Sequence, residues 1–439
     1  MADSADILAL EPRLVSPLCG IVRRLHRVYK DTAEPPKPFI WRAEISNHRF
    51  APSPGEHVTT ASGKGCDHDS ARRGALGEAV ERYCALRLPL EGVRIAPRCE
   101  LPGRALDPRA LVLYSDDQYA ALPYARYEEA MALDWVEGEC LTEPGPCWLP
   151  VQAIYLSESE GLPLLAQQTS NGLAAGATKA DATLRALLEI VERDAFMAAW
   201  YNRLEGAPVD WRGLPDDGAR GVAESYRRRG VDIRLVRLPA DHRIPVFAAI
   251  GLDPAPGGIA AVVGLGCDLS PARAAAGAIL EVGQVRPALR MRLRQDGTRE
   301  RREALVADPS QVSDLEDHDL LYTDARMLGA FDMWLQGPAA AGDWTEPEAA
   351  GAAARLEALL AEIAATGAAA HACDITTPDI AALGLSVVRA VAEDFQPIHF
   401  GEGEARLGGR RLYDLPRRLG RAAAAATRAS LNPLPHPLS

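Results

Sequence analysis

The segment Thr169-Ser-Asn-Gly-Leu-Ala-Ala-Gly-Ala-Thr178 decides the fold, because it joins a loop of small residues to a long run of apolar residues at helical spacing. Thr178 and Asp181, three residues apart, form the pattern of a helix N-terminal capping box. On the predicted helix, Glu189 and Glu192 share one face, while apolar side chains form a stripe that can be buried. The sequence therefore predicts two carboxylates that project from a buried helix beside a glycine loop.

This arrangement is repeated in the chain. A single Glu-x-x-Glu-Arg motif is usually a solvated helix face. However, Ser62-Gly-Lys-Gly65 leads into a second predicted helix that carries Glu78 and Glu81. A weaker third copy follows a glycine-rich apolar stretch and carries Glu281 and Gln284. Three units of loop and acidic helix favour a shared site over ordinary surface chemistry.

Converging carboxylates require cations between them, because like charges about 4 Å apart repel by roughly 4 kcal/mol at an effective dielectric near 20. Oxygen ligands select a hard ion such as Mg²⁺, which takes its remaining ligands from water and phosphates. The pattern therefore favours MgATP. Lys64, Arg82 and Arg193 are the candidates to offset phosphate charge, and the amides of the glycine loops are candidates to cradle phosphate oxygens.

The two common nucleotide-binding motifs do not account for this pattern. Lys64 is followed by glycine, and Val58 stands where the P-loop requires its first glycine. The pair Gly264-Leu-Gly266 does not complete a dinucleotide fingerprint, since Leu269 occupies the third glycine position.

Composition limits the possible partners and the compartment. The 439 residues carry a formal net charge of -12 with a pI near 5.4, which argues against nucleic acid as a general partner. Eight cysteines form no C-x-x-C pair, so a reduced compartment fits best. The chain has no signal peptide and no long apolar run, and we predict a soluble cytoplasmic protein without a membrane segment.

The remaining periodicities predict a mixed α/β fold. The first acidic helix is expected to open at Asp67 or Ser70. The arginine-rich stretch 290–302 is expected to form an exposed loop, or alternatively a contact surface for an acidic partner or leader peptide. Segments with strand-like patterns are 148–155, 232–238, 245–251, 259–264, 370–374 and 386–391.

Three separated motifs in a fixed order resemble the YcaO family. The first is 62–65 with its acidic helix, the second is 170–176 with its acidic helix, and the third is the closing Asn432-Pro-Leu-Pro-His-Pro437. Within that family, the chain looks like the cyclodehydratases of thiazole/oxazole-modified peptide biosynthesis. The resemblance runs from about Val15 to the C-terminus.

The resemblance implies mixed sheets and helices around a MgATP site in a single catalytic domain spanning 1–439, with a core of about 15–400 and a proline-rich tail at 430–439 that reaches the active site. The implied metal ligands are Glu78, Glu81, Glu189 and Glu192. The implied nucleotide-binding residues are Ser62, Lys64, Arg82, Ser170, Asn171, Arg193, Glu281 and Gln284. The implied catalytic tail residues are Pro433, Pro435, Pro437 and Ser439.

The implied reaction is ATP-dependent phosphorylation of a peptide amide oxygen, which converts Cys, Ser or Thr into thiazoline or oxazoline. Two alternatives stay open: another nucleophile at the same site, giving a thioamide or a macrocyclic amidine, and a non-catalytic subunit that binds a peptide or partner. Expected partners are a ribosomally made precursor peptide and a separate leader-binding protein with a ubiquitin-activating-like or winged-helix element. A homodimer is expected.

Overall fold

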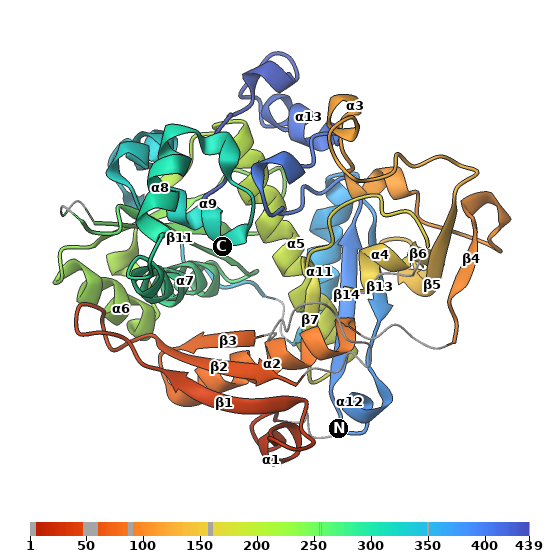
Figure 1. Cartoon of the computed structure of the whole chain (residues 1–439), viewed down its shortest axis with the longest axis horizontal. Coiled ribbons are helices and arrows are strands. Elements are labelled where there is room, and N and C mark those ends of the chain that lie inside the picture. Colours follow the sequence, from red (N-terminus) through yellow and green to blue (C-terminus); the bar gives the residue numbers. More distant parts are fainter. Residues whose placement is uncertain are drawn as a thin grey trace.

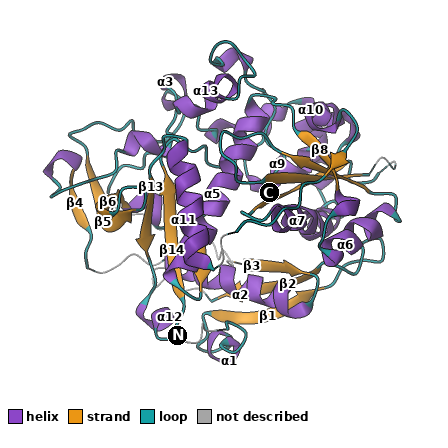
Figure 2. Cartoon of the chain, turned by 180° about the vertical axis from the view of Figure 1, so that it is seen from behind, coloured by secondary structure: helices purple, strands orange, loops and turns teal. Residues whose placement is uncertain are grey.

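A computed structural model describes residues 6–46, 60–86, 91–156, 161–253, 255, 257–348 and 351–438. Within them, helices and strands mix throughout, and the predicted α/β class is confirmed (Figures 1 and 2). The helices are α1 Glu11–Leu14, α2 His68–Ala85, α3 Asp116–Tyr119, α4 Val151–Ile154, α5 Lys179–Tyr201, α6 Asp217–Arg227, α7 Pro271–Arg292, α8 Thr298–Ala307, α9 Leu315–Leu321, α10 Asp332–Leu335, α11 Ala352–Ala365, α12 Pro378–Ala381 and α13 Arg410–Arg418.

The described strands form three sheets. The first has the antiparallel order β1-β2-β3, with strands β1 Val22–Val28, β2 Phe39–Ile45 and β3 Thr60–Gly65. The second has the order β11-β10-β9-β8-β12, with strands β8 Ala207–Asp210, β9 Asp232–Arg237, β10 Val246–Leu252, β11 Ala261–Cys267 and β12 Ala340–Ala341. The third has the order β4-β5-β13-β14-β7 with β6 beside β5, and its strands are β4 Arg94–Pro97, β5 Ala132–Cys140, β6 Gly145–Pro150, β7 Leu173–Gly176, β13 Ala370–Asp374 and β14 Ser386–Ala392.

Helix α5 lies at the centre of the molecule, between the second and third sheets (Figure 1). Its apolar stripe is buried, including Phe196 and Trp200, which stack with ring centroids 6.3 Å apart. Helix α2 packs on β2 and β3, and α7 packs on β10 and β11. The three predicted acidic helices therefore each cover a different sheet, and α5 joins the second sheet to the third.

Two sequence predictions about elements away from the glycine segments differ from the structure. The segment 148–155 continues as strand only to Pro150, where α4 begins, because the chain turns after proline into a single helical turn. The arginine-rich stretch 290–302 is mostly helical, since it contains the end of α7 and the start of α8, and only the turn 293–297 between them is a loop. Arg294 is 2.6 Å from Asp31, and Arg301 pairs with Asp317, so these charges are neutralised inside the chain. Strands β9, β10, β11, β13 and β14 confirm the other predicted strands.

No helix within the described ranges has the length and apolar character needed to cross a bilayer.

Candidate active site

The three acidic helices begin where the sequence predicts, each capped by a side chain. The Asp67 carboxylate accepts from the Ser70 amide at 2.7 Å, and the Thr178 hydroxyl accepts from the Asp181 amide at 3.2 Å. The third helix begins with the same device, since the hydroxyl of Ser270 accepts a hydrogen bond from the backbone of α7. Each cap satisfies an amide that the first helical turn leaves free.

The glycine-rich segments before these helices are strands, which contradicts the predicted loops at 62–65 and 173–176 and agrees with the predicted strand at 259–264. They form β3, β7 and β11. The glycines allow strand and helix to touch: a Cβ on Gly63 would lie 2.0 Å from the Ala71 carbonyl oxygen, and a Cβ on Gly266 would lie 2.0 Å from that of Ala274. Because the backbones approach so closely, glutamates farther along each helix can reach back to the first sheet or to the chain around β7.

Backbone amides at these strands hold the carboxylates. Ser62 N–H donates to Glu78 at 2.8 Å, and Ala175 N–H donates to Glu81 at 2.8 Å. A third such bond runs from the Gly172 amide to the Glu189 carboxylate at 3.2 Å. These three amides therefore orient glutamates, and the expectation that they cradle phosphate oxygens is wrong for them.

Helix α7 joins this group through two side-chain contacts. Lys64 Nζ lies 2.7 Å from Glu281 Oε2, and the Gln284 amide donates to the Ser62 hydroxyl at 3.1 Å. Both contacts link residues that are more than two hundred positions apart in the sequence. All three predicted units therefore meet at one place.

Three carboxylates of this cluster hold protons more tightly than isolated glutamates, whereas Lys64 and Arg193 lower the pKa of Glu281 against the effect of burial. Burial, together with the neighbouring charges of Glu78 and Glu189, raises the pKa of Glu81 to about 8. Burial, with Glu281 and Glu189 nearby, raises the pKa of Glu192 to about 7, against the opposing effect of Arg193. The pKa of Glu189 is also raised by burial. A bound cation would favour the ionised form of these buried carboxylates.

Arg193 indicates that a ligand belongs here. Its Nη1 lies 3.7 Å from Glu192, beyond hydrogen-bond reach, and both Nε and Nη1 are buried without a hydrogen-bond partner among the described residues. Buried donors without partners are costly, and a phosphate oxygen would satisfy them. Arg82, in contrast, already donates to Glu78 at 2.5 Å.

Two cavities meet at Glu189. The larger, of about 460 Å³, is lined by Glu192, Arg193 and Cys267 among others, and its size lies in the range of small-molecule sites. The smaller, of about 170 Å³, is lined by Glu78, Glu81, Arg82, Ser170, Leu173 and Glu189. The residues present fit a hard cation with a phosphate-bearing nucleotide, because carboxylate oxygens and an unpartnered guanidinium face the same space. Asn171 lies on a neighbouring cavity instead.

The C-terminal tail runs along α5 towards this site. The Asn432 amide donates to the Tyr201 carbonyl at 2.6 Å, and the Trp200 indole donates to the Leu434 carbonyl at 2.9 Å. Farther along, the charge of Arg193 acts on His436. Pro435 and Pro437 are buried and Pro433 is exposed, while Ser439 lies outside the described residues.

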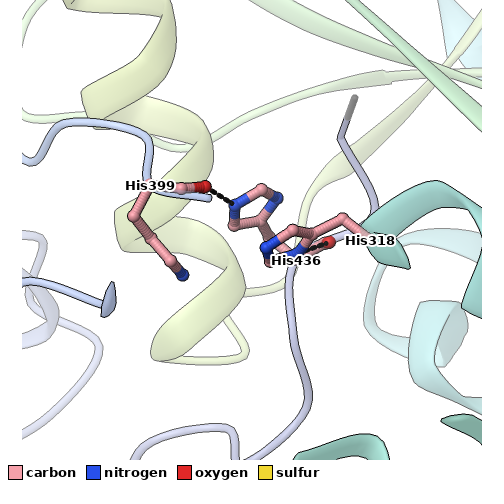
Figure 3. A group of neighbouring side chains, drawn as sticks. All are labelled: His318, His399 and His436. Atoms are coloured by element: carbon pink, nitrogen blue, oxygen red, sulfur yellow. Dashed lines mark hydrogen bonds between the residues drawn. The ribbon is translucent and has the colours of Figure 1, made fainter. Parts of the chain in front are cut away.

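Three buried histidines hold the end of this tail (Figure 3). The rings of His318 and His436 stack with centroids 3.8 Å apart. His318 Nδ1 donates to the His436 carbonyl at 2.8 Å, and His436 Nε2 donates to the His399 carbonyl at 2.9 Å. The other nitrogens of these two rings accept from the amides of Gly401 and Leu438. Both nitrogens of each stacked ring are therefore engaged with the backbone, so we interpret the cluster as a tail clamp rather than a metal site.

Comparison with known proteins decides the family. The family model described as "YcaO cyclodehydratase", binding ATP and Mg²⁺, matches residues 62–396. The chain belongs to the YcaO family. The prediction of the family from three motifs is confirmed, and so is the prediction of ATP and Mg²⁺ as its cofactors.

Relatives and solved structures agree with this YcaO assignment. An uncharacterised protein of Methanothermobacter thermautotrophicus is 31% identical over 236 residues, covering 52% of this chain and 57% of the relative. A solved heterocyclase in complex with substrate and cofactor is 27% identical with a TM-score of 0.78, covering 98% of this chain and 56% of that one. A YcaO protein of Methanopyrus kandleri bound with AMPPCP and Mg²⁺ is 20% identical with a TM-score of 0.62, covers 91% of each chain and shows the shared fold. The chain spans little more than half the length of the first two.

The YcaO motifs did not identify the residues that hold the tail, nor the residue that pairs with the centre of α5. His318 and His399 come from segments without a recognisable pattern, and only their contacts with His436 make them significant. Arg411 was also missed, although its guanidinium lies 2.8 Å from Asp194, the residue next to Arg193. The proline-rich tail was the one available signal for this region.

Proposed function

We propose that the chain is an ATP-dependent enzyme that activates a backbone amide of a ribosomally made precursor peptide and converts Cys, Ser or Thr into a thiazoline or oxazoline. One observation carries the proposal: carboxylates from α2, α5 and α7 converge beside the buried, unpartnered guanidinium of Arg193. Such a group has little structural use by itself, whereas it suits a cation and a phosphate chain.

The residues divide into two sets of proposed roles. Glu78, Glu81, Glu189 and Glu192 would hold Mg²⁺, whose charge would neutralise the phosphate oxygens. Ser62, Lys64, Arg82, Ser170, Arg193, Glu281 and Gln284 would form the nucleotide pocket, whereas Asn171, which the family resemblance also implies there, lines the neighbouring cavity. Among them, Arg193 is the group most available for the γ-phosphoryl oxygens, because its Nε and Nη1 have no hydrogen-bond partner among the described residues.

The chemistry needs no covalent nucleophile of the enzyme. The side chain of the peptide residue attacks the preceding carbonyl carbon and loses its proton, which leaves an oxyanion on the former amide oxygen. That oxygen takes the γ-phosphoryl group of ATP, releasing ADP. Phosphate then leaves with the amide proton, and the C=N bond of the azoline forms. The protein positions two weakly reactive groups and offsets charge as it develops.

The tail is proposed to complete the site. Its buried prolines Pro435 and Pro437 fix an extended segment that approaches Arg193 through His436. From there it can orient the peptide amide and assist proton transfer, as the family resemblance implies. Pro433 is exposed and is proposed only to set the direction of the segment.

A separate leader-binding protein is proposed to deliver the precursor peptide, and the enzyme is proposed to work as a homodimer in the cytoplasm. The domain is proposed to be one catalytic unit, because α5 packs against two of the three sheets and the clusters of buried residues adjoin along it.

Binding of nucleotide tests the first half of the proposal. Titration calorimetry with a non-hydrolysable ATP analogue should show binding in Mg²⁺ that disappears with a chelator. We expect Glu192→Gln and Arg193→Met to weaken binding about tenfold or more, since each removes a charged contact. Glu362→Gln, on α11 and paired with Arg243, is the matched control and should bind as the natural chain does. Equal binding in all four proteins would overturn the site assignment.

Product analysis tests the second half. The chain, its partner and the peptide encoded nearest to its gene should consume ATP, and the peptide should lose the mass of one water for each ring. Exchange of oxygen for sulfur would instead establish the thioamide alternative, and fragmentation would separate an azoline from a macrocyclic amidine. Nucleotide binding without any turnover would favour the non-catalytic subunit.

A further inference from the structure

A third cavity lies beside the acidic site and has a different character. Its volume is about 80 Å³, room for a few water molecules at about 30 Å³ each, so it can hold a small group but not a nucleotide. Its polar lining includes Thr169, Asn171, Arg389 and Arg406, and apolar side chains such as Phe395 close it. It adjoins the acidic cluster, because Ser170 lines the one cavity and Asn171 the other.

Arg389 on β14 lines this cavity as a buried cation, and the nearby charge of Glu189 acts on it without forming an ion pair. Only 7% of the residue is exposed. Its guanidinium donates to the carbonyls of Ala153 at 3.0 Å and Thr169 at 2.7 Å. Its Nη1 is buried with no partner, and Arg389 forms no ion pair with any described residue.

Arg406 adds a second cation of the same kind. Its side chain donates to the carbonyls of Gln167 and Leu111, and its Nε is buried without a partner. Within the part of the chain that the structure describes, it makes no ion pair either. Its carboxylate neighbour Glu404 accepts hydrogen bonds from tyrosines, at 2.5 Å in the case of Tyr114.

Other buried arginines among the described residues have carboxylate partners. Arg286 contacts both Glu34 and Asp253, and Arg411 contacts Asp194 and Asp241 in the same way. A buried charge left alone is far more costly than a paired one. Burial lowers the pKa of Arg389 to about 10, against the opposing charge of Glu189 and with a further contribution from Arg406, so Arg389 stays charged at neutral pH. The cavity therefore holds two adjacent positive charges and lacks the carboxylate that the chain supplies elsewhere.

We propose that this cavity is an oxyanion-binding pocket, in which Arg389 and Arg406 bind a carboxylate or phosphate group. The unpartnered Asn171 Oδ1, also buried, accepts a hydrogen bond and so favours a carboxylate attached to an amide N–H, as in a peptide. Oxyanion binding in this pocket does not depend on the proposed function. The assignment of the carboxylate to the substrate peptide rests on that function, and inorganic phosphate, which the proposed reaction releases, is the other source.

Binding of small charged and uncharged compounds to the full chain, measured at constant ionic strength, tests the pocket. N-acetylglycine carries a carboxylate beside an amide, and N-acetylglycinamide is its uncharged match. We expect saturation-transfer NMR to detect the first and not the second. Arg389→Met and Arg406→Met should each weaken N-acetylglycine binding about tenfold or more, whereas Arg299→Met, an exposed arginine on α8, should leave it unchanged.

The outcomes separate the sources. Competition of inorganic phosphate at lower concentration than N-acetylglycine would assign the pocket to phosphate and exclude the peptide source. Binding of neither anion, or equal binding in Arg406→Met and Arg299→Met, would overturn the pocket. Titration of each variant with the ATP analogue and Mg²⁺ shows whether it is folded. If the natural chain bound N-acetylglycine but not the ATP analogue with Mg²⁺, the result would contradict the proposed function and leave the pocket assignment intact.

Discussion

Glu81 is the side chain whose ionisation reports most directly on the acidic cluster. It is surrounded by Glu78 and Glu189, and burial with these neighbours moves its pKa from 4.5 to about 8. A carboxyl that binds its proton more tightly in the folded than in the unfolded chain favours folding at low pH. Its contribution is lost as the pH rises from the unfolded value to the folded one.

Because folding raises the pKa of Glu81, we expect the ion-free protein to lose thermal stability between about pH 5 and about pH 8. Glu81→Gln should lose less over the same interval, because the group that ionises is gone. Mg²⁺ should raise the melting temperature more at about pH 8 than at about pH 6, since it stabilises the ionised form. Calorimetric melting of both proteins with and without Mg²⁺ gives the comparison. An identical pH slope in the variant would contradict the assignment of that pKa.

At the level of elements, the site depends on three strand-to-helix contacts made possible by glycine. Gly63 on β3 has no room for a side chain, because a Cβ would strike the backbone of α2. Gly77 lies on the same helix, has nothing within 4 Å of the position that a methyl group would take, and offers a matched comparison.

Gly63→Ala should therefore destabilise the protein by about 1–3 kcal/mol, the usual cost of forcing extra volume into a packed contact. Gly77→Ala should stabilise it by up to about 1 kcal/mol, since alanine favours the helix. Urea denaturation measures both. The same sign for both substitutions would show that the approach of β3 to α2 is not tight.

The tail is held by elements distant in sequence, and His318 on α9 is the residue on which its end rests. Its stacking on His436 and its hydrogen bond to the tail carbonyl both involve the imidazole. Burial lowers its pKa to about 4, so the ring is neutral near pH 7 and can keep one donor and one acceptor nitrogen.

Replacing His318 with alanine should release the end of the tail while the fold persists. Hydrogen–deuterium exchange of the peptide covering 431–438 should then become much faster than in the natural chain. His26→Ala, on β1 and far from the tail, is the control and should leave that peptide protected. Unchanged protection in His318→Ala would show that the prolines alone hold the tail.

Across the whole molecule, buried ion triads join segments that the sequence separates. Arg411 on α13 contacts Asp194 on α5 and Asp241 before β10, with all three side chains nearly inaccessible. Without Arg411, both carboxylates would remain buried and unpaired, which is costly. The triad therefore holds the C-terminal region against α5, the helix that carries Arg193.

Arg411→Met should lower the free energy of unfolding by about 3–5 kcal/mol, the cost of leaving a buried charge without its partner. Arg417→Met, on the same helix and paired with Asp414 at the surface, should change it by less than about 1 kcal/mol. Urea denaturation of the two variants provides the measurement. A small effect for Arg411→Met would indicate that water reaches Asp194.

Much of the site could be predicted from sequence because its signals are local. Capping residues such as Asp67 and Thr178 mark helix starts, and the spacing of Glu189 and Glu192 places both on one face of α5. Repetition of the motif indicated that several helices share one site. The order of the motifs then determined the family and its cofactors.

What only the tertiary structure decided depends on contacts between distant segments. The glycine segments at 62–65 and 173–176 look like loops in one dimension, but pairing with neighbouring strands makes them β3 and β7, and amides of both then bind carboxylates. The ion pairs of Arg294 with Asp31 and of Arg301 with Asp317 also join residues that local sequence patterns do not connect. That Arg389 has no ion-pair partner among the described residues likewise cannot be read from the sequence, because an ion pair is defined by distance in space and not by position along the chain.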